Sequence, residues 1–242
     1  MHTHNIPTPQ TALAIGAHPD DIEFGAGATL AKWAADGCVV SFLICTDGSK
    51  GTWDPSTDIK KLIASRKLEQ LEAAKKIPVE GKVVFLGCTD GELREDGTLR
   101  KRITRIIREL KPEVILGHDP WKRYRLHPDH RVAGFLTIDA LVAARDPFFY
   151  PEQDLEPHRP DELFLYEAED ADHFEECRGF EVTKIESLLC HISQFESTMG
   201  IDIAEKESTT EEFRGRVMRQ LALRETETGF PAAEAFKRIT QL

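Results

Sequence analysis

Two clusters of histidine and aspartate, more than a hundred residues apart, carry the side chains best suited to chemistry. The first, His18-Pro19-Asp20-Asp21, follows the apolar run Ala12 to Ala17, and the second is His127-Pro128-Asp129-His130. Two imidazoles and one carboxylate around an open fourth position form the ligand set of a hydrolytic zinc site. Such a metal lowers the pKa of its water to about 7 and polarises the carbonyl that the water attacks. The two clusters together therefore predict one metal-dependent hydrolytic site.

The two clusters contain six ionisable residues, of which three would bind the metal, so the others remain available for general acid–base catalysis. A spare carboxylate can act as general base, and a spare imidazole can stabilise the oxyanion and protonate the departing amine. Spacing alone does not decide which of Asp20 and Asp21 binds the metal, or which of His127 and His130. His130 falls in the first turn of a predicted helix, where the helix dipole favours a neutral imidazole and hence a ligand. Asp129 is expected to orient one of the imidazoles.

Each cluster alone also has a plain structural interpretation as a helix cap or a turn. The occurrence of both in one chain argues against that interpretation, because strands that end side by side would bring the clusters together.

Strands alternating with helices are expected to position the clusters. Predicted strands are the run ending at Ala17, Val39–Cys45, Val83–Leu86, Glu113–Gly117 and Glu162–Tyr166. Predicted helices are Gly27–Ala35, Asp58–Lys76, Leu99–Leu110, Pro128 to about Ala144, Val182–Phe195 and Glu205–Glu225, before a short closing element at Pro231–Ile239. This order predicts a Rossmann-like α/β fold, a doubly wound and mostly parallel sheet with helices on both faces. We expect one domain over residues 12–242 and a flexible N-terminal tail over residues 1–11.

Composition limits the class of protein. The net charge of -11 argues against nucleic acid as a partner. No apolar run approaches the roughly 20 residues needed to span a bilayer, and the N-terminus does not have the pattern of a signal peptide. The five cysteines form no CxxC pair, which is typical of a reducing compartment, so we expect a cytoplasmic protein.

Three further features invite functional interpretation, each with a plain alternative. The loop Thr46–Trp53 lacks the GxxxxGK[ST] spacing of a phosphate loop, so it is either a substrate-facing loop or a simple connection. Arg66 and Glu69 stand three apart on a helix, and spacing alone favours a surface ion pair. Asp90 follows a predicted strand, where it is either a site carboxylate or a turn former.

The two clusters resemble the motifs of the PIG-L/LmbE family of zinc-dependent N-deacetylases. The resemblance runs from about residue 12 to the end and includes Ala17-His18-Pro19-Asp20-Asp21 followed by Gly25, His127-Pro128-Asp129-His130, Thr46-Asp47-Gly48, Arg66 with Glu69, Leu86-Gly87 with Asp90, and His191-Ile192-Ser193-Gln194.

The resemblance implies a role for each matching residue. It makes zinc the cofactor and His18, Asp21 and His130 its ligands. Asp20 becomes the general base, and His127 the residue that stabilises the oxyanion and assists the leaving amine. Arg66 and Asp90 fall where relatives contact the sugar, which reverses the preference for a plain ion pair at Arg66.

One position departs from the family pattern. The deacetylase of the mycothiol pathway has a tyrosine two residues before the first histidine of the second motif, where this chain has Arg125. With the neighbouring aromatic and basic residues over 121–124, Arg125 predicts an anionic or differently decorated substrate and is a candidate substrate contact.

The predicted function is zinc-dependent hydrolysis of an N-acyl amide, chiefly N-acetyl, on an amino sugar or related small molecule. The nearest alternative is an amidase that cleaves a larger thiol conjugate or antibiotic intermediate with the same metal site. A nucleotide-binding Rossmann domain is disfavoured because G-x-G-x-x-G is missing after the first strand. A metal-binding protein without catalysis is disfavoured because all six site residues are present. Iron(II) would accept the same ligands, and the sequence does not decide whether the chain forms a homo-oligomer.

Overall fold

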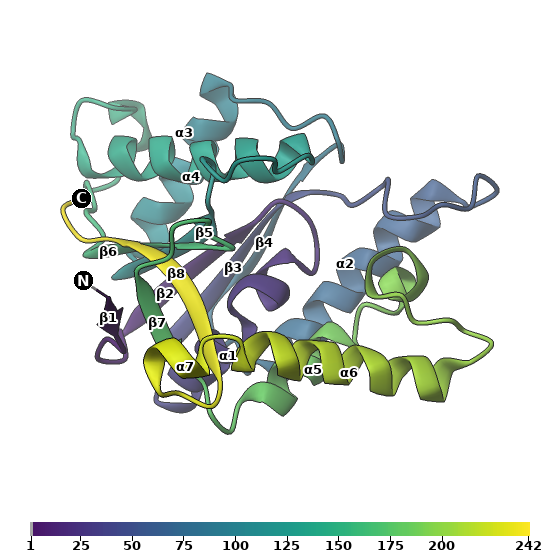
Figure 1. Ribbon diagram of the computed structural model, residues 1–242. Helices are drawn as coiled ribbons and strands as arrows, with labels where there is room; N and C mark the ends of the chain where they lie inside the picture. Colours follow the sequence, from purple (N-terminus) through teal and green to yellow (C-terminus); the bar gives the residue numbers. More distant parts are fainter. Residues whose placement is uncertain (1) are drawn as a thin grey trace.

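A single mixed sheet is the frame of the molecule in this computed structural model, which describes residues 2–242 (Figure 1). Within these residues the sheet has eight strands in the order β1-β7-β8-β6-β5-β2-β3-β4. The strands are β1 (Thr3–His4), β2 (Thr11–Gly16), β3 (Val39–Thr46), β4 (Val83–Cys88), β5 (Val114–His118), β6 (Glu162–Tyr166), β7 (His173–Glu176) and β8 (Ala233–Ile239). Only β8 runs antiparallel to its neighbours, β6 and β7. The predicted doubly wound, mostly parallel sheet is confirmed.

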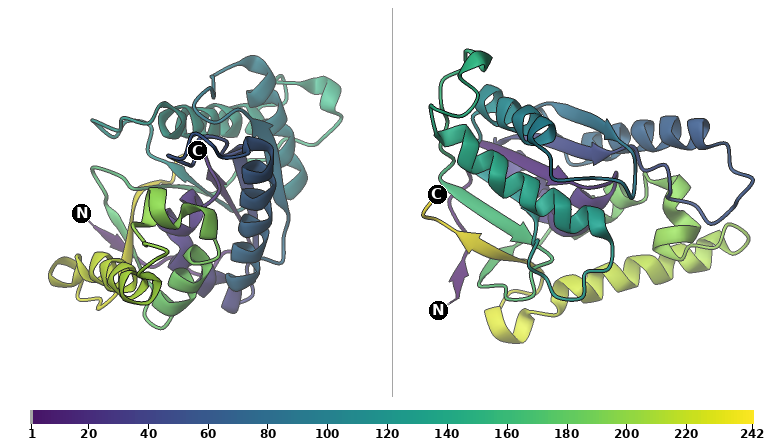
Figure 2. Two further views of the ribbon diagram at one scale, coloured as in Figure 1. Left: turned by 90° about the vertical axis from the view of Figure 1, so that its right-hand side faces the viewer. Right: turned by 90° about the horizontal axis from the view of Figure 1, so that it is seen from above.

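Helices cover both faces of this sheet, as the two views of Figure 2 also show. They are α1 (Asp21–Ala35), α2 (Ile59–Lys76), α3 (Gly97–Leu110), α4 (Pro128–Arg145), α5 (Glu181–Leu188), α6 (Lys206–Ala222) and α7 (Glu225–Thr228). Alternate residues of β2 pack into two hydrophobic cores, one on each face of the sheet. Ala12 and Ala14 pack with α1 and α2 on one face, whereas Leu13 and Ile15 pack with α3 and α4 on the other. Burial on both faces explains why the strand is a continuous apolar run.

Three predicted helix starts are confirmed by a capping aspartate or by a proline. The Asp58 side chain accepts hydrogen bonds from the backbone N–H groups of Lys60 and Lys61, and the Asp96 side chain does the same for Leu99. Pro128 begins α4 as expected. Helix α1 begins at Asp21, six residues earlier than predicted, because the Pro-Asp-Asp turn leads directly into it.

Gly25 allows α1 to lie close to the end of β6. A Cβ atom at this position would clash with the ring of Tyr166. The glycine is therefore required by close approach of helix and strand, and it keeps the first turn of α1 near the site described below.

The structure differs from the prediction in two segments. The predicted helix Val182–Phe195 stops at Leu188 and continues as a 3-10 turn (Ile192–Gln194) and a π turn (Phe195–Met199). Glu69 of α2 accepts hydrogen bonds from the backbone N–H and hydroxyl of Ser193 at 2.9 and 2.6 Å, and these bonds hold the segment against α2.

The second difference lies at the sheet edge. Thr3–His4, expected to be part of a flexible tail, pairs in parallel with β7, and the backbone N–H of Ile6 donates to Glu175. The division into a tail and one domain over residues 12–242 stays a prediction.

The topology creates a crevice beside β2. From β2 the chain adds β3 and β4 on one side and then returns to add β5 and β6 on the other. The carboxyl ends of β2 and β5 thus flank a topological switch point, where open α/β sheets place their ligands. Within residues 2–242, no helix combines the length and apolar character that crossing a bilayer demands.

Candidate metal and catalytic site

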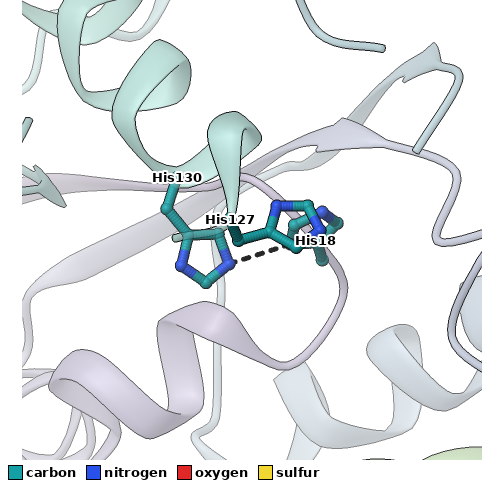
Figure 3. Close-up of side chains that lie close together, drawn as sticks. All are labelled: His18, His127 and His130. Carbon is teal, nitrogen blue, oxygen red and sulfur yellow. Dashed lines mark hydrogen bonds between the residues drawn. The ribbon is translucent and has the colours of Figure 1, made fainter. Parts of the chain in front are cut away.

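Three predicted metal ligands converge at this switch point. His18 Nδ1 lies 3.2 Å from Asp21 Oδ2 and 3.1 Å from His130 Nε2. His130 Nε2 lies 3.3 Å from the other oxygen, Asp21 Oδ1. Two ligands bound at about 2.0 Å in a tetrahedral arrangement are roughly 3.3 Å apart. With Asp21 facing His18 through Oδ2 and His130 through Oδ1, the spacing of these three residues is close to that of the ligands of one small divalent cation. Figure 3 shows the imidazoles of His18 and His130 side by side, with His127 next to them.

Two carboxylates fix the orientation of the His18 ring. His18 Nε2 lies 3.1 Å from Asp90 Oδ1 and 3.3 Å from Asp129 Oδ2. Asp129 is itself held by the backbone N–H groups of Gly91 and Leu93, at 2.7 and 3.2 Å. A proton on Nε2 that faces carboxylates leaves Nδ1 free as a ligand, which is the usual arrangement behind a metal-bound histidine. This geometry supports the expected orienting role of Asp129.

The electrostatics of the cluster favour a bound cation. Burial alone would lower the pKa of His18, but hydrogen bonds to carboxylates, led by Asp129 and Asp21, raise it well above its ordinary value. Burial lowers the pKa of His130 to about 3, although Asp21 opposes this, so its imidazole is neutral at pH 7. Burial would raise the pKa of Asp21, but the imidazoles of His130 and His118 bring it well below its ordinary value. A carboxylate and a neutral imidazole in a buried, acidic site form a cation-binding set.

Further groups share this centre. Sets of donors within 4.8 Å of one another are His18 with His127 and His130, Asp21 with His118 and His130, and His18 with Asp90, His127 and Asp129.

Asp20 stands beside the ligands in an unusual backbone conformation. Its φ is 98°, in the left-handed region, and its side chain is almost fully buried. Burial raises the pKa of its carboxyl to about 6, against the opposing charge of Arg66, whose Nη2 lies 3.4 Å from Asp20 Oδ2. A buried carboxylate with a raised pKa next to a metal site has the properties of a general base.

Arg66 binds the loops around the site and does not form the surface pair that spacing alone suggested. Its guanidinium is 3% exposed and donates to the carbonyl oxygens of Pro19 and Gly48, at 2.7 and 3.0 Å. Glu69 instead accepts hydrogen bonds from Ser193. The interpretation as an Arg66–Glu69 ion pair is thus wrong, because Arg66 points into the protein toward Asp20.

A cavity of about 440 Å³ opens onto these groups. His127 stands at its edge, with the more exposed imidazole of the site. His127 Nδ1 accepts the backbone N–H of Asp129, so Nε2 is the nitrogen left for a ligand. The lining residues are His18, Asp20, Asp21, Lys50, Gly51, Thr52, Trp53, Arg66, Asp90, His127, His130, Gln194, Ser197 and Thr198. The loop Thr46–Trp53 therefore contributes to the cavity wall, in agreement with its interpretation as a substrate-facing loop.

His118, at the end of β5, is a site residue that the sequence analysis missed. Its Nε2 lies 3.2 Å from Asp21 Oδ2 and 3.3 Å from the backbone nitrogen of Ala17, and its Nδ1 lies 3.6 Å from Glu167 Oε2. Its ring stacks on that of His130, with centroids 4.4 Å apart. The available signal was its position at the carboxyl end of a strand that neighbours the first one. As a single residue in no motif, it did not stand out.

Arg125 lies behind His130 and does not line the cavity. Its guanidinium contacts His130 Nδ1 and pairs with Glu167 at 2.6 Å. The neighbouring Arg123 pairs with Glu169. The expected basic rim is therefore partly neutralised by glutamates, and a contact between Arg125 and substrate stays a prediction.

The fold and this cluster define an enzyme of the amide-hydrolysing N-deacetylase class. Comparison with known proteins gives the same class. The family model described as GlcNAc-PI de-N-acetylase (PIG-L) matches residues 13–141. The chain belongs to this family, as its motifs indicated.

Individual relatives cover different shares of the chain. A diacetylchitobiose deacetylase of Thermococcus kodakarensis is 36% identical over 186 residues, which are 76% of this chain and 69% of that protein. A 1D-myo-inositol 2-acetamido-2-deoxy-alpha-D-glucopyranoside deacetylase of Streptomyces scabiei is 30% identical over 165 residues, 58% of this chain, and the chain spans only half of its length. The solved N,N'-diacetylchitobiose deacetylase of Pyrococcus horikoshii superposes with a TM-score of 0.85 at 28% identity, covering 96% of this chain and 84% of that one.

Proposed function

We propose that this protein is a metal-dependent N-deacetylase that hydrolyses an N-acetyl or related N-acyl amide on an amino sugar. The observation that carries the proposal is the convergence of His18, Asp21 and His130 beside the buried carboxylate of Asp20, in a chain of a de-N-acetylase family. Relatives named for deacetylation of acetylated sugars support the substrate class.

Zinc is the proposed cofactor, held by His18, Asp21 and His130. When bound, it would supply Lewis acidity toward the amide carbonyl and lower the pKa of the attacking water. Iron(II) is the competing ion, because it accepts the same nitrogen and oxygen donors.

Asp20 is proposed to take the proton from the attacking water. Its buried carboxyl, with a pKa of about 6, is a stronger base than an exposed aspartate, and it is ionised at neutral pH. The guanidinium of Arg66 stabilises the ionised form and limits the directions in which the carboxylate can turn.

His127 is proposed to act at the other end of the scissile bond. Burial lowers the pKa of its imidazole, which is partly exposed in the cavity wall. From this wall the imidazolium form of the ring can stabilise the oxyanion and hand its proton to the nitrogen as the C–N bond breaks, and the proton that Asp20 took from the water replaces it. The products are a carboxylic acid and a primary amine.

The cavity is large enough for more than an acetyl group. Arg66 and Asp90 are both in its wall, which supports their proposed contacts with a sugar. The alternative, an amidase acting on a larger thiol conjugate or antibiotic intermediate, would release a larger acid from the same site. A cytoplasmic location, supported by five cysteines without a disulfide, completes the proposal.

Asp20→Asn tests the assignment of the base. The variant should keep its zinc, because Asp20 is not a ligand, and its kcat should fall by roughly 100-fold to 10,000-fold. Release of primary amine and of acetate from N,N'-diacetylchitobiose measures turnover, and elemental analysis measures zinc. Full turnover in the variant would show that the base is another group. A larger acid in place of acetate, from a panel of N-acyl amides, would favour the alternative substrate class.

A further inference from the structure

His191 is buried completely, yet it has no role in the mechanism above. Its exposed fraction is 0%, and neither ring nitrogen has a hydrogen-bond partner within residues 2–242. Its Nε2 faces Glu23 Oε2 at 3.9 Å, and Glu23, also 0% exposed, has no other partner for that oxygen among these residues. A buried imidazole and a buried carboxylate are costly to place together unless each serves the other.

Glu23 connects this pair to the active site through one more buried residue. Its other oxygen, Oε1, accepts a hydrogen bond of 2.5 Å from Gln70 Nε2. Gln70 is 0% exposed, and its Oε1 accepts the backbone N–H of Asp20 at 3.0 Å. The amide of Gln70 is thereby fixed in one orientation, because Glu23 accepts from its nitrogen. The chain of contacts runs His191, Glu23, Gln70, Asp20.

The end of this chain is the point at which the backbone is strained. Asp20 has φ 98° and ψ -27°. The left-handed region is unfavourable for a residue with a side chain, so surrounding contacts must hold Asp20 in it. The conformation also decides where the Asp20 carboxylate points relative to His18 and Asp21.

We propose that His191 is a positioning residue, which through Glu23 and Gln70 holds Asp20 in its left-handed conformation and so aims the catalytic base. The proposal rests on the proposed function of Asp20. It gives a role to the His191-Ile192-Ser193-Gln194 segment, which the chemistry of the metal site leaves unexplained. The bonds from Ser193 to Glu69 anchor this segment to α2, the helix that carries Gln70.

His191→Phe is the first test, because it keeps a ring of similar shape and removes the group facing Glu23. In the zinc-loaded enzyme with N,N'-diacetylchitobiose as substrate, kcat should fall by roughly 10-fold to 100-fold, because a displacement of the Asp20 carboxylate by about 1 Å can lower the rate that much. KM should stay within about twofold, and zinc content should stay unchanged. His191→Gln, which keeps an N–H donor toward Glu23, should recover most of the rate.

A second variant separates aiming of the base from general loss of packing. Gln70→Met keeps length and volume but loses the acceptor for the Asp20 N–H, so it should lower kcat to a similar extent. Residues in one chain of contacts should not be additive, so His191→Phe with Gln70→Met should be little worse than either alone. In an Asp20→Asn background, His191→Phe should change the residual rate by less than about twofold.

His173→Phe is the matched control. His173 is also 0% exposed and bonded to a buried glutamate, Glu175, at 2.9 Å, but it lies on β7 at the sheet edge. It should lower thermal stability and leave kcat unchanged.

Three results would overturn the proposal: wild-type kcat in both His191→Phe and Gln70→Met, a full additional loss in the Asp20→Asn background, or loss of zinc in the His191 variants. If His191→Phe fails to fold, Gln70→Met and His191→Gln decide by the same criteria. A wild-type enzyme that releases no amine from any N-acyl sugar would instead refute the proposed function itself.

Discussion

Replacing His118 by Phe should weaken metal binding without removing a ligand. The change keeps an aromatic ring, and so keeps the stacking on His130. It removes the nitrogen that lies 3.2 Å from Asp21 Oδ2. That oxygen keeps the hydrogen bond from the backbone N–H of His18 at 2.7 Å and still faces His18 Nδ1 at 3.2 Å. The change also removes the contacts of His118 with the backbone nitrogen of Ala17 and with Glu167, so the experiment tests the whole support that His118 gives to the proposed ligand Asp21.

The expected size follows from the charge on Asp21. Burial alone would lower the pKa of His118, but Asp21 and Glu167 raise it, so the ring is a charge-assisted donor to the carboxylate. A hydrogen bond to a charged partner contributes about 1.5–3 kcal/mol, and loss of about 2 kcal/mol raises a dissociation constant roughly 30-fold. Loss of outer contacts of this kind costs roughly 10-fold to 100-fold in metal affinity.

Competition with a chromophoric chelator at fixed pH measures the zinc dissociation constant of wild type and variant. His158→Phe is the control, because within residues 2–242 its Nε2 bonds to the backbone oxygen of Pro112 and His158 is not in the cavity wall. A dissociation constant for His118→Phe within about twofold of wild type would refute the reasoning. It would mean that His18 and the metal alone fix Asp21.

Two other variants test separate parts of the structure. His130→Ala removes one of the three proposed metal ligands, so the purified protein should contain little zinc and have no activity. Elemental analysis measures the zinc, and amine release measures the activity. Zinc bound at one ion per chain would exclude His130 as a ligand. Glu175→Gln tests the part of the sheet near its β1 edge. Burial would raise the pKa of Glu175, but His173 and Lys32 hold it below its ordinary value of 4.5. The carboxylate therefore stabilises the folded protein above pH 4.5, and this stabilisation is lost as the pH falls through the lower pKa of the folded state. The variant should lose about 2 kcal/mol in urea unfolding at pH 7 and less at pH 3, and an equal loss at both pH values would contradict the linkage.

The central part of the fold was predictable because its signals are local and repeated. β2, β3 and β5 are buried on both faces and form continuous apolar runs in the sequence. Helices α2 and α3 begin at capping aspartates, and α4 begins at Pro128. The edge strand β1 and its neighbour β7 were missed. Thr3–His4 and His173–Glu176 have no apolar pattern, and their pairing rests on contacts of Glu175 with Lys32 and Ile6, more than 100 residues away.

The site was predictable where its residues share a motif and not where they act singly. His18, Asp21 and His130 stand in two recognisable clusters, and the structure brings them together. His118 and Gln70 each belong to no motif. Their contribution depends on where β5 ends and on which turn of α2 faces Asp20, and neither can be predicted from the neighbouring residues in the sequence.

His118 and Gln70 explain how one tight turn can supply both a proposed metal ligand and a proposed base. Asp20 and Asp21 are adjacent, so their carboxylates would repel each other if both pointed to one spot, and each raises the cost of ionising the other. His118 takes up one oxygen of Asp21, while Gln70 holds the backbone of Asp20 in the left-handed region, beside Arg66. The backbone reversal at Asp20 thus divides the pair between two environments, one made by imidazoles and one by a guanidinium. The proposed metal ligand and the proposed proton acceptor can therefore occupy consecutive positions, because residues from β5 and α2 give them separate environments.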